Sequence, residues 1–201
     1  MMTDNFAHRA AEWDNPSKTE MTKIFVEELK RKIVINKQWK ALEVGAGTGL
    51  VGFQLLPYVN SIVFEDTSAA MLDVLKSKIT TENNIEIVHG EVQQYQKQDV
   101  DLVFSCMAFH HIEDSDATIN HLYSITTNDG VVVIGDLVTE DGSFHHFEPI
   151  PHKGFDVAEL KAKFIKAGFS DVKAHVYNTL KRERIPGVIG EYDQFKKKKK
   201  K

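Results

Sequence analysis

The sequence predicts an α/β fold in which short buried strands alternate with helices. An apolar segment at residues 40–44 runs directly into a turn at 45–49 that holds three glycines at alternate positions. A second apolar segment, at 61–64, ends in two acidic residues and is followed by a helical pattern. Strand, turn and helix in this order, repeated along the chain, are typical of a parallel sheet with helices on both faces.

The expected helices have start signals and one apolar face each. Asn15 and Pro16 suit the start of a helix, so residues 1–38 are expected to form an N-terminal helical cap segment before the first strand. Ser68 is a candidate N-cap for the helix after the second strand. The apolar faces comprise Met21, Ile24, Phe25, Leu29 and Ile33, then Met71, Leu72, Leu75 and Ile79, then Ile119, Leu122 and Ile125, and finally Val157, Leu160 and Phe164.

The remaining strands are expected to be short and apolar. They are expected at 85–88, 101–105, 131–134, about 172–180 and about 188–195. A turn signal at 129–130 precedes the third of these runs. The last helix is expected to start at Asp156 and to stop at Gly168. Because strands and helices alternate without a linker, residues 1–195 are expected to form one domain.

Charge is distributed unevenly along the chain. The formal net charge is −4, but six of the 25 basic residues form the terminal run at 196–201. Without that run, 19 basic residues oppose 29 acidic ones, so the body of the chain is acidic and poorly suited to a nucleic-acid partner. The lysine run itself is expected to be disordered.

The composition is typical of a cytoplasmic protein. The single cysteine, Cys106, excludes an intramolecular disulfide and fits a reducing compartment. The first residues lack the pattern of a secretory signal, and no apolar run approaches the length of a membrane span. We therefore expect a cytoplasmic location and no membrane partner; the oligomeric state is not indicated.

The glycine turn is expected to hold a nucleotide-like ligand. From Gly47 to Gly52 the sequence matches the G-x-G-x-x-G fingerprint of dinucleotide-binding proteins. In that fingerprint the first glycine follows the strand directly, so the frame that begins at Gly45 places Leu50 at the third glycine. Asp66 lies near the spacing at which an acid binds ribose hydroxyls. A ligand without phosphates is favoured, and a nicotinamide-dependent oxidoreductase is the alternative.

Six motifs follow one another along the chain. They are Glu43-Val44-Gly45-Ala46-Gly47-Thr48-Gly49, Asp66-Thr67-Ser68, Met71-Leu72, Gly90-Glu91, Asp101-Leu102-Val103-Phe104-Ser105 and His110-His111-Ile112. This ordered series resembles the class I S-adenosylmethionine-dependent methyltransferases. The resemblance implies an enzyme with S-adenosyl-L-methionine as cofactor. It also implies a Rossmann-like, seven-stranded, mostly parallel sheet whose last strand is antiparallel.

The same resemblance assigns the cofactor site. The glycine turn is expected to hold the methionine part, Asp66 the ribose hydroxyls, and Met71 with residues 90–92 the adenine. The full expected set is Glu43, Gly45, Ala46, Gly47, Gly49, Asp66, Thr67, Met71, Gly90, Glu91, Val92 and Ser105. Phe6 and Trp13 resemble an N-terminal segment that closes over the pocket in related proteins; burial in the core is the alternative.

Candidate catalytic residues follow the fourth and fifth strands. A sulfonium methyl donor needs an acceptor held in line and protected from water, rather than a protein nucleophile. A general base is needed only if the acceptor loses a proton, and His111, His110 and Asp136 are the candidates. The two histidines could instead form a pocket wall. We expect a small-molecule acceptor, and a catalytically silent adenosylmethionine-binding module is a further alternative.

Four potential metal ligands lie in the loop after the fifth strand. They are His145, His146, Glu148 and His152. Adjacent histidines do not easily converge on one ion in a regular strand, and no cysteine cluster or H-E-x-x-H arrangement accompanies them. We therefore expect no metal and interpret this loop as a lid over the acceptor.

Overall fold

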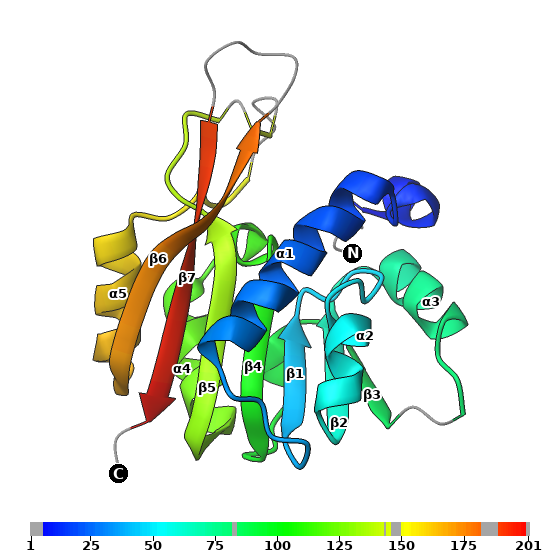
Figure 1. Cartoon of the computed structure of the whole chain (residues 1–201), viewed down its shortest axis with the longest axis horizontal. Coiled ribbons are helices and arrows are strands. Elements are labelled where there is room, and N and C mark those ends of the chain that lie inside the picture. Colours follow the sequence, from blue (N-terminus) through cyan, green and yellow to red (C-terminus); the bar gives the residue numbers. More distant parts are fainter. Residues whose placement is uncertain (1–5, 82–83, 143, 146–149, 182–188, 200–201) are drawn as a thin grey trace.

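A sheet with the strand order β3-β2-β1-β4-β5-β7-β6 forms the centre of the molecule (Figure 1). The computed structural model describes residues 6–81, 84–142, 144–145, 150–181 and 189–199. The strands are β1 (Lys40–Val44), β2 (Ser61–Asp66), β3 (Ile85–His89), β4 (Val100–Cys106), β5 (Thr126–Leu137), β6 (Phe169–Lys181) and β7 (Ile189–Lys199). The first five strands pair in parallel, which confirms the α/β, Rossmann-like class, and β7 pairs antiparallel with β5 and β6.

The strand order reverses beside β1. This strand pairs with β2 on one side and with β4 on the other, so the connections leave it in opposite directions. Open α/β sheets bind their ligands at such a switch point, outside the carboxyl ends of the strands. The glycine turn after β1 and the loop after β4 both lie at this edge of the sheet.

Helices cover both faces of the sheet. They are η1 (Ala7–Glu12), α1 (Pro16–Lys32), α2 (Gly52–Leu55), η2 (Leu56–Tyr58), α3 (Ala69–Ser77), η3 (Val92–Gln94), η4 (Phe109–His111), α4 (Ser115–Ile125) and α5 (Val157–Lys166). The expected caps are confirmed, because the Asn15, Ser68 and Asp156 side chains accept hydrogen bonds from first-turn N–H groups. No helix in the described part of the chain is long and apolar enough to cross a membrane.

The core has two layers because side chains alternate along each strand. Leu42, with residues of α4 and α5, belongs to one buried cluster, whereas its neighbour Ala41 packs with α1, α2 and α3 in the other. Figure 1 shows α1 and α2 in front of the sheet and α4 behind it. Both faces of β1 are therefore buried, which explains its continuous apolar run.

Two elements differ from the sequence-based expectation. The helix after the glycine turn, α2, has only four residues and starts at Gly52. The glycine turn at 45–49 therefore precedes the helix and is not part of its first turn. The turn signal at 129–130 lies inside β5, where the pairing shifts from Thr126 with Val100 to Val131 with Leu102. This shift places four residues of β5 opposite Asp101 alone, as in a bulge.

The lysine run also differs from the expected disordered tail. β7 continues to Lys199, and Lys196, Lys197 and Lys198 pair with Val133, Val132 and Val131 of β5. Backbone groups alone make a strand ladder, so a run of lysines can continue one. Residues 200 and 201 lie outside the described residues.

Candidate functional site

The glycine turn follows β1 directly, in the frame that begins at Gly45. Gly45, Gly47 and Gly49 have φ angles of 66°, 55° and 82°, a region in which other L-residues are strained. Between them, the Ala46 N–H donates to the Glu65 carbonyl over 2.8 Å, which ties the turn to β2. Three glycines at alternate positions are thus required by the backbone path of this turn.

The three glycines face different surroundings. A Cβ on Gly45 would lie 2.4 Å from the Ala108 Cβ, and one on Gly49 would lie 2.7 Å from the Phe53 ring. On Gly47 a Cβ would meet only the indole nitrogen of Trp13, at 3.7 Å. Gly45 and Gly49 therefore permit close packing inside the protein, whereas Gly47 faces the N-terminal segment with room to spare.

Carboxylates at the ends of β1 and β2 accept hydrogen bonds from the turn. Asp66 accepts from the Gly47 N–H over 2.6 Å and, with its other oxygen, from the Ser68 N–H over 2.8 Å. Glu65 accepts from the Gly45 N–H over 3.3 Å. Glu43, the acid inside the motif, accepts from the Gly52 N–H over 3.0 Å at the start of α2.

The surroundings of these acids disfavour negative charge. Burial raises the pKa of Glu43 well above its usual range, and the nearby Asp66 charge raises it further, while Lys78 opposes the shift. Burial, followed by the charge of Asp66, likewise raises the pKa of Glu65. A cationic group bound here would relieve this repulsion, whereas a phosphate would increase it.

The remaining expected cofactor residues surround the ends of β2, β3 and β4. The Gly90 N–H donates to the Asp66 carbonyl over 3.0 Å, which joins the ends of β3 and β2. Met71 and Val92 are buried, whereas Thr67 and Glu91 are exposed. Ser105 in β4 is fully buried, and its hydroxyl has no hydrogen-bond partner in the described part of the chain.

The expected catalytic residues form a buried pair and a neighbour. His110 in η4 is 1 % exposed, and its Nδ1 lies 2.5 Å from Oδ1 of Asp136, near the end of β5. The His110 N–H donates to the second oxygen of Asp136 over 3.1 Å. This double contact fixes both the ring and the backbone of His110 against β5. The ring of His111 lies beside that of His110, with 4.1 Å between centroids.

A third histidine joins this pair from the loop after β5. Nε2 of His145 lies 3.0 Å from Nε2 of His110, and the His145 ring contacts that of His111 edge-on. Burial, together with the neighbouring His110, lowers the pKa of His111 to about 3 and also lowers that of His145, which disfavours the charged form of both rings. Sequence reasoning did not join His145 to this pair, because the path of the loop gave no signal.

The rest of the loop divides between core and surface. The His152 N–H donates to the His110 carbonyl over 3.2 Å, and its ring stacks on Phe155. Phe155 is buried and packs against Phe109, so this end of the loop belongs to the core. His146 and Glu148 lie outside the described residues.

The N-terminal segment contacts both groups of residues. Phe6 meets the Trp13 ring edge-on at 5.8 Å and the His111 ring at 5.2 Å. Asp14 accepts from the Thr48 hydroxyl over 2.5 Å and pairs with Lys78, which also donates to the Thr48 carbonyl. The segment therefore lies across the glycine turn and reaches the histidines, as expected for a cover rather than a core element.

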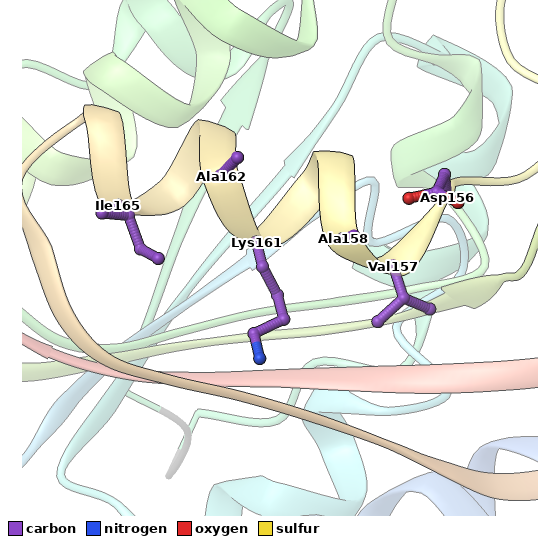
Figure 2. A pocket seen from close by; sticks show the side chains of 6 residues that line it. All are labelled: Asp156, Val157, Ala158, Lys161, Ala162 and Ile165. Carbon is purple, nitrogen blue, oxygen red and sulfur yellow. The ribbon is translucent and has the colours of Figure 1, made fainter.

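A separate hollow lies on the outer side of α5 (Figure 2). It has a volume of about 550 Å³, and Figure 2 shows Val157, Lys161 and Ile165 extending from the same side of the helix. None of its lining residues belongs to the glycine turn or to the histidines. We therefore do not include this hollow in the candidate site.

Comparison with known proteins connects these residues to one family. A model described as a methyltransferase domain matches residues 42–134, which include the glycine turn, Asp66 and the two adjacent histidines. The chain is 32% identical over 139 residues to a malonyl-[acyl-carrier protein] O-methyltransferase of Ilyobacter polytropus, covering 65% of this chain and 50% of that protein. It is 28% identical over 164 residues to an uncharacterized methyltransferase of Schizosaccharomyces pombe, covering 69% and 58%. The chain thus spans about half the length of the curated relatives it matches.

Solved structures share the fold at low sequence identity. The methyltransferase in complex with the Haloferax volcanii Trm112 activator has a TM-score of 0.81 at 15% identity, with 99% of both chains covered. Phosphoethanolamine N-methyltransferase 2 of Haemonchus contortus, in complex with S-adenosyl-L-methionine, has a TM-score of 0.72 at 16% identity and covers 86% of this chain and 51% of that one. The matched domain model and the methyltransferase relatives thus make this chain similar to methyltransferases over residues 42–134, and solved structures of methyltransferases share its fold.

Proposed function

We propose that this chain transfers the methyl group of S-adenosylmethionine to a small-molecule acceptor. The observation that best supports this function is the set of left-handed glycines whose N–H groups bind the carboxylates of Glu65 and Asp66. This set lies at the switch point of the sheet, where open α/β folds bind their ligands.

The residues present fit this cofactor. Asp66 accepts the N–H groups of Gly47 and Ser68 at the end of β2, near the spacing at which an acid binds ribose hydroxyls. The acidic surroundings of Glu43 and Glu65 suit the positively charged sulfonium and ammonium groups of the ligand. The buried hydroxyl of Ser105 lacks a partner in the described residues, and a bound ligand would supply one.

When bound, the cofactor supplies an activated methyl group, and the chain supplies position and exclusion of water. Phe6 and Trp13 cover the space between the glycine turn and the histidines. If the acceptor loses a proton, His110 is the best supported base, because Asp136 holds its Nδ1; the acceptor would have to replace His145, whose Nε2 lies 3.0 Å from Nε2 of His110. The low pKa of His111 makes that ring a weaker base and favours a wall role.

A small acceptor is supported by the acidic body of the chain and by the phosphoethanolamine N-methyltransferase that shares its fold, which is named for a small acceptor. The malonyl-[acyl-carrier protein] O-methyltransferase is named instead for an acyl group on a carrier protein. A dinucleotide is a poorer ligand, because its pyrophosphate would face Glu43, Glu65 and Asp66. Gly52, the third glycine of the alternative fingerprint, is explained by packing instead, because a Cβ added there would lie 2.1 Å from the Phe64 ring.

Isothermal titration with S-adenosylmethionine, S-adenosylhomocysteine and NAD tests the cofactor. Asp66→Asn keeps the shape of the side chain but removes its charge, so we expect roughly 10- to 100-fold weaker binding of S-adenosylmethionine. Asp73→Asn is the matched control, because Asp73 is an exposed acid on α3 that pairs with Lys76 over 3.0 Å. Binding of NAD alone, or equal affinity in Asp66→Asn and wild type, would contradict the proposal.

Transfer of labelled methyl from S-adenosylmethionine into a cell extract tests the acceptor. We expect the label in the fraction of small molecules, where its mass identifies the product. Label in protein or RNA would contradict the small-molecule acceptor but would still support methyl transfer. An absence of label with intact cofactor binding would favour the catalytically silent module.

A further inference from the structure

Three histidines converge beside the candidate acceptor space. The ring nitrogens of His110, His111 and His145 that face one another all lie within 4.8 Å. Asp136 holds His110 from behind, at 2.5 Å from Nδ1, and Glu140 lies 3.8 Å from Nδ1 of His145. Two histidines are thus backed by carboxylates on the side away from the cluster.

With all three rings neutral, the hydrogen bonds of this cluster do not close without a further group. Because Nδ1 of His110 donates to Asp136, Nε2 of a neutral His110 ring has only a lone pair. His145 must then donate from its own Nε2, 3.0 Å away, and its Nδ1 becomes a second lone pair. Nδ1 of His145 and Oε1 of Glu140 are both buried, and neither has a hydrogen-bond partner among the described residues. Two buried acceptors facing each other are unfavourable.

We propose that His110, His111 and His145 bind one divalent transition-metal ion, with Zn²⁺ as the expected occupant. Neutral imidazoles are the ligands that Zn²⁺ takes in three-histidine sites. With an ion on both Nε2 atoms, the proton of His145 moves to Nδ1 and faces Glu140, so each buried lone pair gains a partner. The site then has two carboxylate-histidine-metal units, through Asp136 and through Glu140.

The distances suit an ion after small movements of the rings. Zn–N bonds of about 2.0–2.1 Å in a tetrahedron place neighbouring nitrogens about 3.3 Å apart. The two Nε2 atoms of His110 and His145 are 3.0 Å apart, close to this value. The His111 ring is held by aromatic contacts with Phe6, His110 and His145, so a rotation of this ring would be needed to bring its nitrogen to the ion.

The ion would leave one tetrahedral position open for an exchangeable ligand. A metal and a proton compete for the same lone pair on His110, so the metal-bound protein does not use His110 as a base. The cluster joins His145 of this loop to two histidines of η4, a combination that the loop sequence at 145–152 does not indicate by itself. The inference does not depend on methyl transfer, because it rests on the cluster alone.

Zinc titration of the chelator-treated full chain tests the site, with a competing chromophoric chelator as readout. We expect one Zn²⁺ per chain, and Co²⁺ in the same site should give the visible absorption of a tetrahedral complex. His145→Ala and His111→Ala should each abolish stoichiometric binding. Glu140→Gln removes only the supporting carboxylate and should weaken binding by roughly 10- to 100-fold.

His89→Ala is the matched control, because His89 is exposed at the end of β3 and outside the cluster. It should bind Zn²⁺ as wild type does, and circular dichroism should show all variants folded. The proposal is overturned if wild type binds no Zn²⁺, or if His145→Ala binds it equally well. Adenosylmethionine titration of the same metal-free protein keeps the two proposals separate, since either affinity can fail while the other remains.

Discussion

The glycine turn and the histidine cluster lie at the same edge of the sheet but are built in different ways. The turn uses backbone N–H groups between Gly45 and Gly49, held by carboxylates at the ends of two adjacent strands. The cluster uses side chains that come from η4, β5 and a later loop. A backbone site restricts which residue types can occupy each position, whereas a side-chain site depends on where separate segments meet.

Removal of His110 should give the largest effect on stability, because it leaves the buried Asp136 without its ring partner. We expect His110→Ala to lower the free energy of unfolding by about 3–5 kcal/mol, measured by urea denaturation with chelator present. His111→Ala is the comparison, since His111 is less buried than His110. The hydrogen bonds of Asp136 within the cluster go to His110 and not to His111. Similar losses in both variants would show that the Asp136 contact is not the source of the stability.

Substitutions in the glycine turn should separate backbone strain from packing. Gly45→Ala combines a left-handed φ of 66° with a Cβ only 2.4 Å from Ala108, and we expect a loss of about 3 kcal/mol. Gly47→Ala has a similar φ of 55° but an uncrowded Cβ, so strain alone should cost about 1 kcal/mol. The two urea midpoints measure this difference. Equal losses would mean that Ala108 yields without cost.

The pH dependence of stability should distinguish the acids of the turn. Burial raises the pKa of Glu43 in the fold, so the unfolded chain releases this proton at lower pH. The free energy of unfolding therefore falls as pH rises from about 4.5, the usual value, toward the raised pKa. The slope is at most about 1.4 kcal/mol per pH unit for one group.

Glu43→Gln should make this slope shallower, while Glu65 retains its own contribution. Denaturation midpoints from about pH 4, just below the usual value, to about pH 7 measure this slope. Glu20→Gln, on the exposed side of α1, should leave the slope as in wild type. A slope that Glu43→Gln does not change would assign the pH dependence to other groups.

Much of the fold was predictable because local signals agree with it. Asn15, Ser68 and Asp156 cap helices as expected, and the apolar runs at 61–64 and 85–88 lie within β2 and β3. The exceptions depend on pairing rather than on propensity. The turn signal at 129–130 lies in a strand because β5 bulges against β4, and the terminal lysines extend β7 because β5 offers a partner.

The site was predictable only in part. Gly45 and Asp66 belong to two motifs of the ordered series, and the structure joins these motifs through the Gly47 N–H, which donates to Asp66. The partnership of His110 with Asp136 follows from the ends of adjacent strands. His145 had no such signal, because a loop of unknown path decides which ring it meets.

The segment from Phe6 to Asp14 contacts the glycine turn and the histidines at the same time. A displacement of this segment would uncover the glycine turn and the histidines together, so ligand exchange at the turn would be coupled to ligand exchange at the histidines. A ligand that holds the segment in place at the turn also lowers the entropic cost of holding it over the histidines. Thermodynamic reciprocity then requires that a ligand at the histidines strengthen binding at the turn by the same factor.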